Sequence, residues 1–367
     1  MIYLDNGATS FPKPPSVREA VRWAMENCTN PGRGGYRSAM AAAELVYRCR
    51  ETAAAMFSCQ PEQVAFTSNC THGLNIAIST LVQPGDPVLI SGFEHNAVTR
   101  PLHALQARLA VAGRRLFDWE DTLSQWEDGL KKGVKAAIFT HVSNVFGYIL
   151  PIAQMAALCR QYGVPFIVDA AQSAGMIDVN FEELGADFLA MPGHKGLLGP
   201  QGTGMLLCSS LPKPLICGGT GSLSLEQAMP DFLPDRLEAG TVNVPGIAGM
   251  LAGMRYVNRA GMRNIFTRQI HQADLCIRDL RKLGLQVFAG AHQSGTVSFL
   301  PGMDCQEAAE RLSSQGIALR AGLHCAPLAH EQAGTLQTGT LRVSFGHDAC
   351  DRQRIALLRG LQKIMVN

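Results

Sequence analysis

Between about residues 60 and 210, short apolar segments alternate with segments of helical periodicity. The apolar segments predict strands at 64–67, 87–91, 135–142, 164–169, 188–191 and 205–208. Helices are predicted at 71–82, where Thr71 is a suitable N-cap, and at 151–162, where Pro151 occupies the first turn. Uniformly apolar strands that alternate with helices indicate an α/β fold, with a mostly parallel sheet covered by helices on both faces.

The pattern changes after about residue 250. A long helical stretch at 246–283 precedes short strands at 287–288 and 296–300, and a helix at 304–315, a strand at 341–345 and a helix from Asp351 follow. This order is typical of a smaller α+β lobe. We therefore expect a large domain at 16–250 and a small domain formed by 1–15 and 251–367.

The composition excludes several classes of function. Of 367 residues, 47% are hydrophobic and 17% are charged, and the net charge is +2, so no strong field favours nucleic acid or an anionic membrane. No apolar run approaches the roughly 18 residues that a membrane span needs. The opening MIYLDNGATS has no basic segment followed by an apolar one, so we expect a cytoplasmic protein without a secretory leader.

Eleven cysteines are scattered without a CxxC pair or a zinc-type Cys/His spacing. We therefore expect neither a disulfide framework nor a metal site, and most of these cysteines are interpreted as small core residues. Cys325 differs, because it lies in the Gly-, Ala- and Pro-containing segment RAGLHCAPLAH next to His324 and near Arg320. Cationic neighbours favour a thiolate, so Cys325 is a candidate nucleophile.

Polar residues recur where the predicted strands end, which is where parallel α/β sheets bind ligands. Alone, each has an ordinary interpretation: Asp169 could cap a helix, His95 could be a hydrogen-bonded histidine, and Lys195 could be solvent-exposed. The residues concerned are Thr71, His72, His95, Asn144, Asp169, Gln172, His194 and Lys195.

Together these residue types fit one chemistry. A lysine amine in a dry site loses its proton and can form a Schiff base with a carbonyl cofactor. A buried aspartate can keep a pyridine nitrogen protonated, and a histidine can stack on the ring. A helix N-terminus can bind a phosphate. The pattern therefore predicts a pyridoxal 5′-phosphate site with Lys195 as the Schiff-base residue.

Motifs along nearly the whole chain make a family resemblance specific. They include YLDNGATS, NPGRGGY, FTSNCTHGLN, EHNAV, HVSNVFG, VDAAQSAG, GHKGLLGPQGTG, EAGTVN and RAGLHCAPLAH. The chain resembles the class V aminotransferase family and, within it, cysteine desulfurases and selenocysteine lyases of the group II type. The resemblance implies the aspartate aminotransferase-like fold of pyridoxal-phosphate-dependent transferases.

The resemblance also implies roles for individual residues. Gln172 would bind the phenolic oxygen of the cofactor, and Thr71, His72 and His194 would border its phosphate. Thr241 matches a phosphate contact that the family takes from the other subunit, which implies a homodimer with sites at its interface. Asn144 and Arg342 match residues that hold the substrate carboxylate, with Arg320 nearby.

For Cys325 the resemblance implies the sulfur-accepting nucleophile of a cysteine desulfurase. The substrate would be L-cysteine, Lys195 would remove its α-proton, and the products would be L-alanine and a persulfide on Cys325. A protein acceptor or a reductant would then take the sulfur by thiol exchange. Only 17 positions separate Cys325 from Arg342, so a long mobile loop is not expected.

Two positions depart from the pattern of many relatives. Pro192 stands where a phosphate-binding hydroxyl is common, and His72 stands where glutamate is common. These differences leave open selenocysteine lyase, cysteine-sulfinate lyase, aminotransferase and epimerase activities. A non-catalytic sulfur carrier is a further alternative, but such a protein has no need of Lys195 and Asp169.

Overall fold

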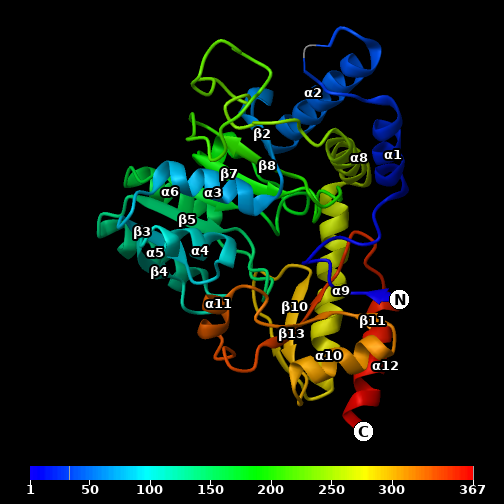
Figure 1. The fold of residues 1–367 in the computed structure, drawn as a ribbon. Helices are drawn as coiled ribbons and strands as arrows, with labels where there is room; N and C mark the ends of the chain where they lie inside the picture. The colour runs from blue at the N-terminus through cyan, green and yellow to red at the C-terminus, as the bar shows by residue number, and fades with distance from the viewer. Residues whose placement is uncertain (33, 367) are drawn as a thin grey trace.

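The computed structural model describes residues 1–32 and 34–366, and within them seven strands form one large sheet (Figure 1). In sheet order the strands are β2 (Val64–Thr67), β8 (Gly204–Cys208), β7 (Phe188–Pro192), β6 (Phe166–Asp169), β5 (Ala136–Thr140), β3 (Pro87–Ser91) and β4 (Arg108–Ala112). Strand β8 runs antiparallel to both of its neighbours, and the other neighbouring pairs are parallel.

Helices cover both faces of this sheet, which explains why its central strands are apolar throughout. On one face α3 (Cys70–Leu81) and α4 (Asn96–Ala104) bury Leu74 and Val98. The other face is covered by α2 (Arg37–Phe57), α5 (Trp119–Lys131), α6 (Ile152–Gln161) and α8 (Val244–Ala260). Trp126 of α5, Met155 of α6 and Met250 of α8 belong to a second core cluster on this face. Two further helices of this lobe are α1 (Pro15–Asn27) and α7 (Phe181–Leu184).

The second lobe lies below the large sheet in Figure 1 and is joined to it by the long helix α9 (Met262–Lys282). Its antiparallel sheet has the strand order β12 (Arg320–Gly322), β13 (Thr340–Ser344), β10 (Thr296–Leu300) and β9 (Gln286–Phe288). A separate pair joins β1 (Ile2–Tyr3) to β11 (Ile317–Ala318), so the N-terminus lies against the C-terminal part of the chain. The helices of this lobe besides α9 are α10 (Cys305–Ser314), α11 (Pro327–Gln332) and α12 (Asp351–Val366).

The predicted fold class is confirmed, and three local expectations are corrected. The helix predicted at 71–82 begins at Cys70, and its N-cap is Asn69 rather than Thr71, because the Asn69 side chain accepts the His72 N–H. The stretch at 246–283 is two helices separated by Gly261, whose φ is +79°. Pro151 precedes its helix as the N-cap instead of forming the first turn.

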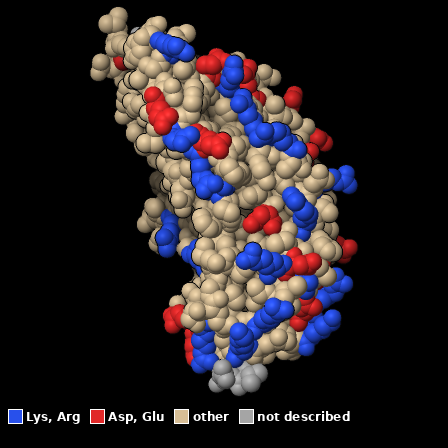
Figure 2. Space-filling model, turned by 90° about the vertical axis from the view of Figure 1, so that its right-hand side faces the viewer, with Lys and Arg blue, Asp and Glu red and all other residues tan. Residues whose placement is uncertain are grey.

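The surface agrees with the small net charge. Figure 2 shows acidic and basic side chains interspersed over the face that it presents. Within the described residues, none of the helices is both long and apolar enough to cross a membrane. Arg33 of the NPGRGGY motif lies outside the described residues.

Candidate functional site

Lys195 follows β7 in a tightly packed turn of small residues. A Cβ atom on Gly196 would meet the Ala174 carbonyl oxygen at 2.3 Å, so only glycine fits next to the lysine. Lys195 is partly buried, and among the described residues no hydrogen bond or ion pair engages its amine. Burial lowers the pKa of Lys195, while the nearby Asp169 carboxylate opposes this shift.

Asp169 ends β6 and pairs in register with Ala190 of β7, which places it close to the start of the Lys195 turn. The carboxyl group is buried, and its Oδ1 accepts the Ala171 N–H at 2.8 Å and the Cys70 thiol at 3.5 Å. Oδ2 has no such partner within the described part of the chain. The aspartate thus stabilises the local turn with one oxygen, and the other is available to a ligand.

His95 and Gln172 are oriented by single hydrogen bonds. His95 is the N-cap of α4, and its Nδ1 accepts the Ala97 N–H at 3.0 Å, so Nε2 carries the proton of the neutral ring. Burial lowers the pKa of His95, with Asp169 opposing. The Gln172 amide donates to the Gly7 carbonyl at 2.9 Å, which joins the N-terminal segment to the edge of the sheet.

The N-terminus of α3 and the residues before Lys195 form a second side of the site. Thr71 is exposed in the first turn of α3, where backbone N–H groups favour an anion. His194 Nδ1 is buried without a partner among the described residues, and burial lowers the pKa of His194 to about 4. The His194 carbonyl accepts the Lys13 amine at 2.7 Å.

Two arginines face each other across β12 and β13, where Arg320 pairs in register with Arg342. Arg342 is 1% exposed and donates to the Asn144 carbonyl at 2.9 Å and to Asp5 at 2.6 Å. Its Nε is buried without a partner in the described chain. Burial lowers the pKa of Arg342, which Asp5 opposes. One paired and one exposed guanidinium therefore leave positive charge for an anionic ligand.

Most of the predicted site residues line one cavity of ≈ 230 Å³ between the lobes. It also contains Pro192 at the end of β7, and Cys70, whose thiol contacts Asp169. The predicted residues in its wall are Thr71, His95, Asn144, Asp169, Gln172, His194, Lys195, Arg320 and Arg342.

Three predicted residues lie outside this wall. His72 and Thr241 line a neighbouring cavity of ≈ 350 Å³. Cys325 is exposed on the segment between β12 and α11, and its carbonyl accepts the Asn96 N–H at 2.7 Å. Cys325 is therefore adjacent to the His95 side of the cavity without lining it.

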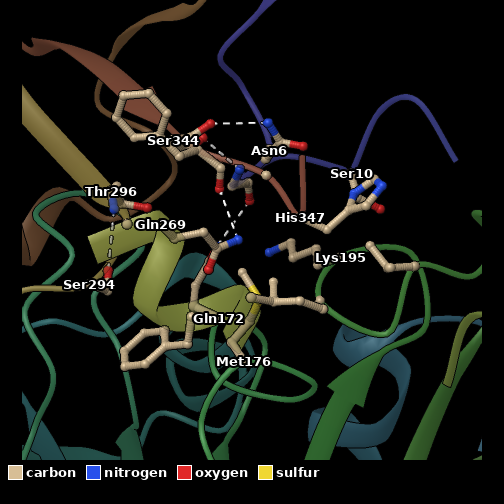
Figure 3. Close-up of a pocket in the computed structure, with 18 of the residues that line it drawn as sticks. Asn6, Ser10, Gln172, Met176, Lys195, Gln269, Ser294, Thr296, Ser344 and His347 are labelled. Atoms are coloured by element: carbon tan, nitrogen blue, oxygen red, sulfur yellow. Dashed lines mark hydrogen bonds between the residues drawn. The ribbon is translucent and has the colours of Figure 1, made fainter. Parts of the chain in front are cut away.

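A smaller chamber of ≈ 40 Å³ adjoins Lys195 and Gln172 (Figure 3). Gln269 of α9 lines it, and the Gln269 Oε1 is buried without a partner among the described residues. A water needs about 10–15 Å³ of such volume, so the chamber has room for a few waters beside the lysine.

Three residues at the site were not predicted from the sequence, namely Asp5, Cys70 and Gln269. Asp5 lies within the quoted YLDN motif, so the motif itself could have identified it. Cys70 was grouped with the core cysteines, yet its place at the first position of α3 brings it to Asp169. No sequence motif marks Gln269, because it reaches the site through the packing of α9.

Comparisons with known proteins extend along almost the whole chain. The family model described as aminotransferase class-V matches residues 2–354. A Methanothermobacter thermautotrophicus protein named "Probable cysteine desulfurase" is 32% identical over 365 residues, covering 94% of this chain and 90% of its own. The apo cysteine desulfurase of Thermococcus onnurineus superimposes with a TM-score of 0.90 at 29% identity, covering 99% and 94% of the two chains. The cysteine desulfurase CsdA of Escherichia coli gives a TM-score of 0.84 at 26% identity, with the same coverage.

Proposed function

Because the chain belongs to the aminotransferase class-V family, we propose that it is a pyridoxal-phosphate-dependent cysteine desulfurase. It converts L-cysteine to L-alanine and collects the sulfur on Cys325 as a persulfide. The observation that carries this proposal is the convergence of Lys195, Asp169, His95 and Arg342 on one cavity, with an exposed cysteine beside it.

The residues present fit the cofactor on which this family depends. Among the described residues, Lys195 offers an amine without a hydrogen-bond or ion-pair partner, and Asp169 offers a carboxylate oxygen without one. Thr71 at the N-terminus of α3 and His194 would border the phosphate, Gln172 would meet the phenolic oxygen, and His95 would lie against the ring. When bound, the cofactor supplies an electron-accepting ring that stabilises negative charge at the α-carbon of an amino acid.

The side chains then divide the work. Arg342 and Asn144, with Arg320, hold the substrate carboxylate. The Lys195 amine, whose pKa is lowered by burial, removes the α-proton. The Cys325 thiolate attacks the substrate sulfur, so a sulfur–sulfur bond forms as the substrate Cβ–S bond breaks. The electron pair of the broken bond stays on the carbon fragment, which takes up one proton at Cβ, regains the α-proton from Lys195 and leaves as alanine.

A homodimer follows from the same proposal. Thr241 is exposed and does not line the Lys195 cavity of its own chain, so its phosphate contact would reach the site of a second subunit. Large apolar side chains on α1, α2 and the 209–243 segment support such an interface, since they are exposed in the single chain. They include Trp23, Tyr47, Leu215, Ile216 and Leu225. A protein thiol that accepts the sulfur is a further proposed partner.

The decisive experiment is alanine formation by the purified, cofactor-loaded protein. L-Cysteine, L-selenocysteine and L-cysteine sulfinate are supplied in parallel, with and without a thiol reductant, and Cys325 is examined by mass spectrometry. We expect a yellow protein that forms alanine from L-cysteine and gains one sulfur on Cys325. Turnover of selenocysteine or sulfinate alone would favour the corresponding lyase. A colourless protein that takes up no pyridoxal phosphate would leave a non-catalytic role.

A further inference from the structure

The backbone around Cys325 has an unusual conformation. His324 and Cys325 are consecutive non-glycine residues with φ values of +48° and +57°. Residues other than glycine rarely adopt this left-handed backbone conformation, so neighbouring residues must hold the turn in place. The His324 side chain is buried and Cys325 is exposed. The turn thus directs one side chain inward and the thiol outward.

Both carbonyl groups of this pair are bound by residues that follow strands of the large sheet. The Asn144 side-chain amide donates to the His324 carbonyl at 2.7 Å. The backbone N–H of Asn96, the first residue of α4, donates to the Cys325 carbonyl at 2.7 Å. On the opposite side, His324 Nε2 donates to the Thr340 carbonyl in β13 at 3.2 Å. The turn is therefore fixed from both lobes.

We propose that Asn96 and Asn144 form a carbonyl clamp that fixes the direction in which the Cys325 thiol leaves the backbone. Both are then positioning residues for the nucleophile, in addition to the contact of Asn144 with substrate. This inference rests on the proposed role of Cys325 as the sulfur acceptor. The clamp also explains how a short segment without regular structure keeps a left-handed pair.

Asn144 links the clamp to the residue that would bind the substrate carboxylate. Its side-chain amide carries two N–H groups, and the His324 carbonyl accepts from only one of them. Its backbone carbonyl accepts from Arg342 at 2.9 Å. A substrate carboxylate held by Arg342 and by the second N–H of the Asn144 amide therefore lies at a fixed position relative to Cys325. We therefore expect substitutions of Asn144 to alter both KM and kcat, and removal of the Asn96 N–H to alter kcat alone.

Asn96→Pro tests the clamp with little other change. Proline is tolerated at the first position of a helix, and His95 before it is already extended with ψ of 155°. The variant removes the N–H that binds the Cys325 carbonyl, and Asn96→Ala is the matched control that keeps it. The first readout is hydrogen exchange at the Ala326 amide, which bonds the Leu323 carbonyl across the turn at 2.9 Å.

We expect Asn96→Pro to exchange this amide about fivefold to tenfold faster than Asn96→Ala, the effect of one lost hydrogen bond. In the cofactor-loaded protein, alanine formation in the first turnover falls by a similar factor at an unchanged KM. Equal exchange in the two variants overturns the clamp.

If Asn96→Pro does not fold, Asn144→Asp provides the same test. It keeps the side-chain volume and removes both N–H donors, so it must also accelerate exchange at Ala326, and unchanged exchange overturns the clamp. A wild-type protein that makes no alanine from cysteine contradicts the proposed function, while the exchange measurement still decides the clamp.

Discussion

Lys195 and Cys325 have nucleophilic side chains near one cavity, but the structural surroundings of the two differ. Lys195 follows a central strand, and close packing of small residues surrounds it, so burial acts on its amine. Cys325 is exposed on a left-handed turn that is fixed through its backbone carbonyl. The surroundings of Lys195 control the proton affinity of its amine, and those of Cys325 control the direction of its thiol. Retention of the cofactor and transfer of sulfur should therefore be separable by mutation.

The largest effect is expected for Lys195→Ala. It removes both the proposed covalent attachment point and the proposed base, so the visible absorption of the bound cofactor should disappear. Alanine formation should fall by a factor of about 10³ or more. Lys13→Ala is the matched control, because the Lys13 amine also lies at the site, where it bonds the His194 carbonyl. If Lys195→Ala kept the yellow colour that Lys13→Ala is expected to keep, the assignment of Lys195 as the Schiff-base residue would be contradicted.

Cys325→Ser tests the second side chain of the comparison, the exposed thiol that is proposed to accept the sulfur. A hydroxyl is a poor acceptor for sulfur, so alanine formation from L-cysteine should fall by a factor of about 10²–10³ while the yellow colour persists. Cys217→Ser and Cys350→Ser are controls, since these thiols are exposed as well. Alanine formation by Cys325→Ser at the wild-type rate would exclude the persulfide role.

The two regions also differ in how far the sequence alone predicts them. Strand β6 was predicted to end at Asp169 because its apolar run stops there, and the structure agrees. The edge strand β4 was not predicted, since it begins with the charged Arg108 and its first two residues are exposed at the border of the sheet. The opposite edge strand, β2, is buried along its whole length and was predicted correctly. Strands are therefore predictable from the sequence where they are buried, at an edge as well as in the interior.

The same distinction applies to the candidate site. Residues at strand ends, such as Asp169 and His95, were expected to converge, and they line one cavity. His72 was expected beside them, but its ring turns toward Ser68 and the neighbouring cavity. The conformation of Cys325 could not be inferred, because it depends on bonds from Asn96 and Asn144, which are more than 150 positions away in the sequence.

Acidification should affect the Cys325 region through His330, a fully buried histidine whose ring lies 5.8 Å from that of His324. Burial lowers the pKa of His330 from 6.5 to about 4. Between these values the unfolded chain binds more protons than the folded one, so the free energy of unfolding falls as the pH drops. Each unit of pKa shift corresponds to about 1.4 kcal/mol. The shift of His330 therefore lowers the free energy of unfolding by about 3 kcal/mol over this pH range.

His330→Gln should therefore flatten the decline of stability between pH 6.5 and 4 by about 2–3 kcal/mol, measured by urea unfolding. The exposed His103→Gln is the control. His194→Gln beside Lys195 should give a smaller change, because His194 is only partly buried and solvent screens its charge. Equal slopes for wild type and His330→Gln would show that this histidine is not the acid-sensitive group.

The smallest effect is expected at Pro192, which ends β7 opposite Gly204 and lines the Lys195 cavity. Pro192→Ser adds a hydroxyl where the cofactor phosphate is proposed to bind, and a hydrogen bond to a charged group contributes about 1.5–3 kcal/mol at best. Strain from replacing a buried proline opposes that gain, so we expect the dissociation constant of pyridoxal phosphate to fall by no more than about tenfold. Pro192→Ala separates the hydroxyl from the new backbone N–H. If the serine and alanine variants bind the cofactor equally well, the hydroxyl position is not a phosphate contact, and the helix N-terminus at Thr71 must hold the phosphate without it.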